Sequence, residues 1–256
     1  MWTYAIRALS PFIYTPEVIQ PLLMCGLLPQ TLFPIRFLTQ PVGSEHIVLN
    51  TPSEFSTSLI DATFYKDDYL RVPLYAVNGS EFTFSVKKDN LYLHETVVAV
   101  LFTQEPLEAG LLTLDALKQT IVDMAKVINI GYANVYDTTI LKYRRLQSYY
   151  GPPGEKAYPL EIGWIAYFAP PLVDFLGRER FDNFKTYHEK IEVNGGILVV
   201  LTEEPFDASN PEHREREAQA IAELGLDKLS TMTKAGATAL EARRKRLAQQ
   251  GDKKKN

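Results

Sequence analysis

Cysteine is almost absent from this chain, which has 256 residues and a single cysteine, Cys25. One cysteine excludes a disulfide framework within the chain and any zinc site built on several cysteine ligands. Such sparse cysteine is compatible with a reducing compartment. Because 46% of the residues are hydrophobic and 11% are aromatic, the chain can instead build a sizeable apolar core.

Long apolar runs are missing as well. No stretch of about 18 uncharged apolar residues occurs, so we expect no membrane-spanning helix. The first 40 residues are apolar, but five prolines interrupt them and no basic start precedes a continuous apolar core, so we expect no secretory signal. We interpret residues 1–45 as a proline-rich, irregular arm packed on the domain, with a misassigned start codon as the alternative.

The chain also lacks the motifs of common catalytic and metal sites. None of its histidines is within four residues of another, and H-E-x-x-H, G-x-S-x-G and G-x-G-x-x-G do not occur. GPPGEK at 151–156 is no phosphate loop, because only two residues separate its glycines and its prolines remove N–H donors. We predict no catalytic residue, no cofactor and no metal ion, although spacing alone leaves open a metal site assembled from distant residues.

Negative charge is concentrated in the body of the chain. From Lys228 onward there are nine Lys/Arg and two Asp/Glu, a balance of +7, and the remaining residues hold 18 basic and 29 acidic side chains, a balance of −11. We predict that residues 230–256 form a basic, solvated tail; contact with nucleic acid or acidic lipid is the alternative. An acidic body repels nucleic acid and attracts basic partners, although solubility alone explains it equally well.

The spacing of apolar residues predicts an α+β fold: one domain over residues 46–229, with a mostly antiparallel sheet built from hairpins and two or more packed helices. Strands are predicted over 64–77 and 160–168, and hairpins over 81–102 and 190–202, the second with its tight turn at Asn194-Gly195. Helices are predicted over 111–130, which has one apolar stripe, 171–186 and 210–224, with Thr113 and Asn210 as N-caps. Residues 151–159 are predicted to be a loop. Alternation along 160–168 puts Ile162, Trp164 and Phe168 on one face.

Two stretches about 100 residues apart share one pattern. AVLFTQEPLEAG at 99–110 and LVVLTEEPFDAS at 198–209 both read apolar run, Thr, Gln or Glu, Glu, Pro and a bulky apolar residue. Pro106 and Pro205 cannot extend a strand ladder, so each copy is predicted to end a strand shortly before a helix. We interpret the pattern as structural punctuation, and an internal duplication of a strand–helix unit would explain its repetition.

GWIAYF at 163–168 and HEKIEVNGGILVVLTEEPFDASNPEH at 188–213 resemble the immunity protein 52 family of bacterial polymorphic-toxin and type VI secretion systems. The resemblance covers residues 158–226 strongly and 64–150 loosely, and Ile165-Ala166 departs from the Met-Thr of many members. The matching positions are Gly163, Trp164, Tyr167, Gly196, Leu201, Thr202, Glu204, Phe206, Asn210, Pro211, Glu212 and His213.

This resemblance implies a cytoplasmic protein, not an enzyme, that binds and neutralises a cognate toxin made by the same cell. In such families the toxin is often a nuclease with a restriction-endonuclease-like fold. A nuclease is basic around its nucleic-acid groove, so an acidic body suits this partner. The resemblance implies no membrane contact and no direct contact with nucleic acid, and the oligomeric state is left open.

We predict that acidic side chains near strand ends and loops bind the partner, together with an aromatic anchor. Trp164 is predicted to lie in the core; a role as an exposed interface anchor is the alternative. The predicted residues are Asp67, Asp68, Glu203, Glu204 and Asp207, with Tyr150 or Tyr167 as the anchor. For Glu204 and Asp207 a local turn or helix-approach hydrogen bond is the competing role. Two other classes stay open: a secretion adaptor or chaperone, and a small enzyme with a dispersed active site.

Overall fold

The computed structural model of the chain describes residues 4–11, 33–38, 46–51, 54, 69–76, 79–88, 96–127, 129–143, 147–152, 156–229 and 231–232. Its larger sheet contains β1 (Tyr4–Ser10), β2 (Ile35–Leu38), β3 (His46–Leu49), β4 (Tyr69–Ala76), β5 (Glu81–Lys88), β6 (Thr96–Phe102), β7 (Tyr132–Asp137), β10 (Ile165–Phe168), β11 (Glu189–Val193) and β12 (Gly196–Val200). Its smaller sheet contains β8 (Ser148–Gly151), β9 (Lys156–Pro159) and β13 (Thr231–Met232). The helices are α3 (Glu105–Glu108), α4 (Leu114–Val127), α5 (Pro170–Leu176), α6 (Arg178–Asn183) and α7 (Pro211–Glu223), with 3-10 helices η2 (Thr138–Lys142) and η3 (Leu226–Lys228).

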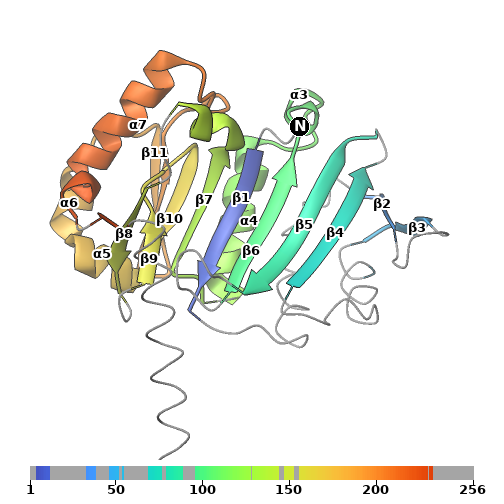
Figure 1. Ribbon diagram of the computed structural model, residues 1–256, viewed down its shortest axis with the longest axis horizontal. Coiled ribbons are helices and arrows are strands. Elements are labelled where there is room, and N and C mark those ends of the chain that lie inside the picture. The colour runs from blue at the N-terminus through green and yellow to red at the C-terminus, as the bar shows by residue number, and fades with distance from the viewer. Residues whose placement is uncertain are drawn as a thin grey trace, which may run out of the picture.

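Ten antiparallel strands form the larger sheet in the order β11-β12-β10-β7-β1-β6-β5-β4-β2-β3, and three form the smaller one in the order β13-β8-β9 (Figure 1). The predicted α+β class and single domain are therefore confirmed. Both predicted hairpins are present, as β5–β6 and β11–β12. Asn194 and Gly195 have φ of 49° and 76°, the left-handed backbone that a tight two-residue turn requires.

The first strand corrects our interpretation of the N-terminal segment. β1 pairs with β6 on one side and β7 on the other, so residues 4–10 lie in the middle of the larger sheet. Residues 35–38 also belong to this sheet, as β2, so the domain does not begin at residue 46. All seven residues of β1 are buried, and a strand covered on both faces lacks the polar alternation that would have indicated it. The rest of the proposed arm lies outside the described residues.

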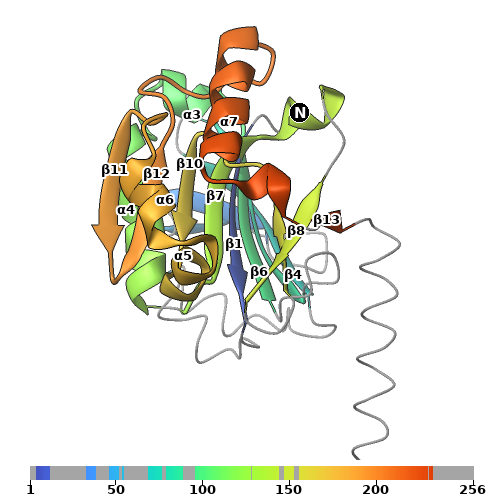
Figure 2. The same ribbon diagram turned by 90° about the vertical axis from the view of Figure 1, so that its left-hand side faces the viewer.

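The larger sheet is covered on both faces. Leu117, Ile121 and Met124 of α4 lie in one hydrophobic cluster with Tyr4 and Ile6 of β1. The second cluster contains buried residues of α5, α6, α7 and the smaller sheet, together with Leu9, whose side chain faces the opposite side of β1. Figure 2 shows α4 on one side of the sheet and β8 and β13 on the other. The core is thus divided into two layers by the sheet.

The segment 151–168 differs from the prediction in two places. Residues 151–159 are not a loop throughout, since β8 and β9 pair there in the smaller sheet. The strand predicted over 160–168 begins only at Ile165. Gly163 has φ of +71° and interrupts the alternation, so Trp164 lies in the α4-side cluster while Ile162 and Phe168 lie in the other.

Several predicted helices and caps agree with the structure. In α4 the hydroxyl of Thr113 accepts the N–H of Ala116 at 3.1 Å, and in α7 the side chain of Asn210 accepts the N–H of Glu212 at 2.9 Å. The helix predicted over 171–186 is instead two helices, α5 and α6, separated by Gly177. Within the described residues, no helix combines the length and apolar character needed to cross a membrane. Of the predicted tail, only Thr231–Met232 is described, and it pairs with β8.

Candidate functional site

The two copies of the repeated pattern end at the same edge of the molecule. β6 and β7 are both antiparallel to β1, and β12 is antiparallel to β10, which is antiparallel to β7. β6, β7 and β12 therefore run in one direction, and Figure 1 shows α3 and the loop before α7 at the upper end of the sheet. The helices after the two copies differ, because α4 and α7 pack on opposite faces of the sheet.

We call this region the acidic end. It is defined by exposed carboxylates from α3, from the loop after β12 and from the first turns of α7: Glu105, Glu108, Glu203, Glu204, Asp207, Glu212 and Glu215. Burial, followed by the negative charges of Asp137, Asp207 and Glu108, raises the pKa of Tyr4. Tyr4 pairs with Phe102 at the end of β6 and with Asp137 at the end of β7, and Asp137 accepts the N–H of Ala208 from the loop after β12, so the segments that follow these three strands start close together.

The loop between β12 and α7 is held by its own hydrogen bonds. The N–H and the hydroxyl of Ser209 donate to Oδ1 of Asp207 at 2.7 and 2.6 Å. These bonds, first that of the hydroxyl, lower the pKa of Asp207. The N–H of Ala208 donates to Oδ2 of Asp137 at 2.8 Å, which ties the loop to the end of β7. Asp207 thus has the predicted local-turn role, although its carboxylate is still exposed.

His213 connects the loop to α7. Its Nδ1 accepts the N–H of Asp207 at 3.0 Å, so the ring proton lies on Nε2, which donates to Oε1 of Glu204 at 3.0 Å. The backbone N–H of Glu204 and then the hydrogen bond from His213 lower the pKa of the Glu204 carboxyl. Hydrogen bonds therefore hold two carboxylates of the acidic end, those of Glu204 and Asp207, in place.

His213→Leu is expected to return the pKa of Glu204 toward its ordinary value of 4.5, because the variant loses the donor to this carboxylate. In the wild type the lowered pKa contributes stability above the unfolded-state pKa, and this contribution disappears as the pH falls through the folded-state pKa. Carboxyl NMR titration measures the shift, with His188→Leu, an exposed histidine, as the control. An unchanged Glu204 titration in His213→Leu would contradict this account of the loop.

A groove of ≈ 480 Å³ lies beside α7. Its polar lining includes Glu204, Glu212, Glu215, Arg216 and Gln219, together with Thr186 from the segment before β11. Three carboxylates against one guanidinium make the groove acidic. The positive end of the α7 dipole and its cap at Asn210 stabilise the negative charge of Glu212 there.

An exposed aromatic residue lies next to this loop. The ring of Tyr143, just after η2, has the guanidinium carbon of Arg214 at 4.8 Å from its centroid. Nη1 of Arg214 donates to the carbonyl oxygens of Ala208 and Ser209 at 2.7 and 2.8 Å. Tyr143 is 47% exposed, so the guanidinium packs against part of the ring while another part is in contact with solvent.

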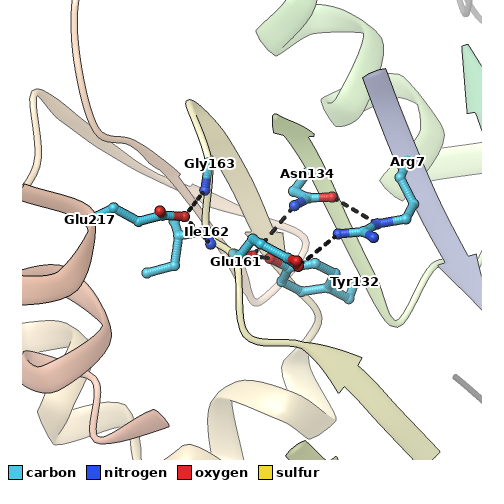
Figure 3. A network of polar contacts seen from close by, with 7 residues as sticks. All are labelled: Arg7, Tyr132, Asn134, Glu161, Ile162, Gly163 and Glu217. Carbon is cyan, nitrogen blue, oxygen red and sulfur yellow. Dashed lines mark hydrogen bonds and ion pairs between the residues drawn. The ribbon is translucent and has the colours of Figure 1, made fainter. Parts of the chain in front are cut away.

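A buried polar network positions the elements beneath this surface (Figure 3). Arg7 of β1 donates to Glu161 Oε2 at 3.3 Å and to Asn134 Oδ1 at 3.1 Å. The backbone oxygen of Glu161 accepts the Tyr132 hydroxyl at 2.6 Å. All four side chains are buried, so these bonds connect β1, β7 and the segment before β10 in a medium of low dielectric constant.

Glu217 extends this connection to α7. Its Oε1 accepts the N–H groups of Ile162 and Gly163 at 3.0 and 2.8 Å, and the residue is only 1% exposed. Backbone N–H groups that donate to a buried carboxylate stabilise its negative charge. Glu217 therefore fixes where α7 lies on the sheet, and with it the position of the groove and of His213.

The structure brings together only part of the predicted site. Glu203, Glu204 and Asp207 lie at the acidic end, and Asp67 and Asp68 lie outside the described residues. Trp164 and Tyr167 are each 2% exposed and lie in the core, so neither is a surface anchor. The indole N–H of Trp164 donates to the Thr202 carbonyl at 2.9 Å. Tyr150 is half-buried on the smaller sheet.

Sequence reasoning missed the contribution of the first copy and of η2. Glu105 and Glu108 follow the same pattern as Glu203 and Glu204, so the repeat itself was the signal, but the shared strand direction was needed to use it. Tyr143 belongs to KYRRLQSYY at 142–150. The sequence shows that this segment mixes basic and aromatic residues, but it does not show that Tyr143 contacts α7. Among the described residues, no group of three or more His, Cys, Asp and Glu is arranged to hold a metal ion.

The fold and the site define a class: a single-domain α+β protein with an open antiparallel sheet and an acidic surface at one end of its strands. The structure is similar to that of the Pseudomonas aeruginosa T6SS (type VI secretion system) protein PA0821, with a TM-score of 0.53 and 10% sequence identity over 88% of this chain and 73% of that one. This likeness shows the fold. No family model and no curated protein sequence matches the chain, so the resemblance to the immunity protein 52 family stays a prediction.

Proposed function

We propose that this chain is an immunity protein of the immunity protein 52 type, which binds and neutralises a cognate protein toxin in the cytoplasm of the cell that makes both. The proposed toxin is a basic nuclease of a type VI or related secretion system, with a restriction-endonuclease-like fold. The chain acts by binding and not by catalysis. The acidic end is the observation that carries this proposal.

Charge complementarity supports a basic protein partner. The carboxylates of the acidic end outnumber the basic side chains described there, which are Lys142, Arg214 and Arg216; residues 144–146 lie outside the described part. Oppositely charged surfaces steer diffusional encounter and raise the association rate. In the proposed complex the carboxylates face the groove of the nuclease, so an acidic inhibitor competes directly with the phosphate groups of nucleic acid.

Two comparisons point to the same biological setting. The residues around Gly163-Trp164 and 201–213 resemble an immunity family, and the structure contributes a reason for several of them: Gly163, Trp164, Thr202, Asn210 and His213 all form the contacts that hold the loop and α7. The protein of similar fold is described as belonging to the type VI secretion system. An immunity role fits both.

Co-expression tests the proposal directly. Candidate toxins are taken from the products of the genes adjoining that of this chain, and each is produced in a sensitive host with and without this chain. We expect the host to survive only with this chain, and the purified proteins to form a complex that inhibits the nuclease. Death of the host despite ample amounts of this chain would refute the proposal, and altered toxin export without rescue would identify a secretion adaptor.

Charge reversal at the acidic end is expected to slow association with the toxin by roughly 10-fold or more at low salt. The variant is Glu108→Lys, Glu203→Lys and Glu215→Lys, three exposed residues whose side chains form no hydrogen bond within the described part of the chain. Surface plasmon resonance at several salt concentrations measures the rate, and the wild-type rate should fall as salt rises.

A control variant carries the same change in net charge at another place. Asp174, Glu179 and Asp182 are exposed on α5 and α6, and α5 begins at the opposite end of β10 from the acidic end (Figure 1). Their reversal to lysine should slow association much less. Equal slowing by both variants would mean that net charge alone, and not the acidic end, attracts the partner.

A further inference from the structure

We propose that Tyr143 is the aromatic anchor of the partner-binding surface, receiving a Lys or Arg side chain of the basic partner on the part of its ring that Arg214 does not cover. This inference rests on the proposed function and names the residue through which the surface holds its partner. Large apolar side chains that are exposed within the described residues are few: Val48, Tyr143 and Phe175. Tyr143 alone among them lies next to the loop of the acidic end.

The position of Tyr143 follows from the chain direction. β7 ends at Asp137, whose side chain accepts the N–H of Thr139 at 2.7 Å and so begins η2. η2 ends at Lys142, and the N–H of Tyr143 donates to the Ile140 carbonyl at 2.9 Å. The other oxygen of Asp137 accepts Ala208 N–H. One carboxylate therefore fixes both η2 and the loop before α7, so that Tyr143 and Arg214 are held side by side.

Arg214 is fixed before any partner binds. Its two carbonyl acceptors belong to Ala208 and Ser209, and Ser209 is itself bonded to Asp207. A guanidinium held in this way does not need to be ordered on binding, and it restricts the ring that packs against it. Tyr and Arg are the residues most enriched, with Trp, at positions that dominate binding energy, and preorganised aromatic residues lose little entropy when they become buried.

The occupant follows from charge. Arg214, which contacts the ring, is bonded to the carbonyl oxygen of Ser209, and Ser209 donates to Asp207, so the ring lies next to the loop of the acidic end and is covered by the same basic partner. A Lys or Arg side chain of that partner gains a cation–π contact on the ring. The ring therefore acts in dissociation, whereas the carboxylates act mainly in association.

The experiment measures binding of the toxin identified by the co-expression test, in catalytically inactive form, to the full chain. Tyr143→Ala should weaken binding by roughly 10- to 30-fold, mostly through faster dissociation. Tyr143→Phe keeps the ring and should weaken binding less than Tyr143→Ala does. Phe175→Ala removes an aromatic residue of equal exposure, 48% against 47%, at the opposite end of β10, and should leave binding within about 2-fold of wild type.

The possible outcomes separate this inference from the proposed function. Dissociation accelerated by Tyr143→Ala alone supports the anchor. If the wild type binds and protects while Tyr143→Ala dissociates at the wild-type rate, the anchor is wrong and the proposed function stands. Equal losses in Tyr143→Ala and Phe175→Ala also overturn the anchor. If the wild type neither binds nor protects, the proposed function fails first. Circular dichroism and thermal unfolding verify that all variants are folded.

Discussion

Arg7→Ala is expected to lower the free energy of unfolding by about 3–5 kcal/mol, because it leaves the carboxylate of Glu161 buried without its cation. The two side chains are 8% and 3% exposed and 3.3 Å apart, so water cannot replace the lost partner. The same substitution removes the donor to Asn134 and the guanidinium that lies 4.5 Å from the ring centroid of Tyr136. Denaturant unfolding near neutral pH measures the loss.

Two further variants distinguish a buried pair from a general sensitivity to substitution. Arg7→Met with Glu161→Leu removes both charges and should lose less stability than the sum of the two single substitutions. Arg178→Ala breaks the pair with Glu192, a contact of 2.7 Å between exposed side chains, and should change the unfolding midpoint little. An Arg7→Ala variant as stable as Arg178→Ala would show that the network does not hold the sheet together.

The parts of the fold that were predicted correctly are those with local causes. The β11–β12 hairpin follows from Asn194-Gly195, whose backbone the turn requires, and α7 follows from Asn210 and Pro211 at its start. The apolar stripe of α4 indicated the face that packs on the sheet. In each case the residues that determine the element lie within a few positions of it.

The parts that were missed depend on residues far apart in the chain. Arg7 and Glu161 are separated by 154 positions, and no local pattern relates them. β1 reads as an unpatterned apolar stretch because both of its faces are buried, so its place between β6 and β7 follows only from assembly of the sheet. The predicted alternation over 160–168 failed at Trp164, which follows the positive φ of Gly163 and lies in the α4-side cluster, whereas Ile162 and Phe168 share the other cluster.

Only the part of the candidate site that has a local cause was predicted from the sequence. The role of Glu203, Glu204 and Asp207 at a strand end was visible in the sequence, since Pro205 marks the end of the strand. Glu105 and Glu108 lie at the same end, but predicting this would have required knowing that β6 and β12 run in the same direction. Tyr167 was expected to be an exposed anchor, but it belongs to the buried α4-side cluster, and Tyr143 lies at the surface instead.

Gly163→Ala is the second substitution with a large expected effect, at least about 3 kcal/mol of unfolding free energy. A Cβ at this position would lie 2.4 Å from the carbonyl oxygen of Val135 and 2.8 Å from Cβ of Tyr136, and φ is +71°. Neither neighbour is the free end of a flexible side chain, so the backbone itself must move. Thermal and denaturant unfolding measure the cost.

Gly110→Ala separates the two causes. Gly110 has nearly the same φ, +67°, but an added Cβ would meet no atom within 4 Å. Gly110→Ala should therefore lower the free energy of unfolding only by the cost of placing an alanine at positive φ, about 1–2 kcal/mol. Equal losses in the two variants would mean that close packing against Val135 contributes nothing.

The displacement caused by Gly163→Ala also reaches the binding surface. The N–H of Gly163 donates to Glu217 at 2.8 Å, and that of Trp164 donates to the Val135 carbonyl at 2.7 Å. Movement of this backbone loosens the hold of Glu217 on α7, whose first turns contain Glu212, His213 and Arg214. Gly163→Ala should consequently increase hydrogen exchange at the Asp207 amide and weaken toxin binding, whereas Gly110→Ala should leave the exchange of this amide unchanged. Because Glu217 of α7 and the indole of Trp164 both connect this segment to the acidic end, a substitution in the core is expected to alter the surface.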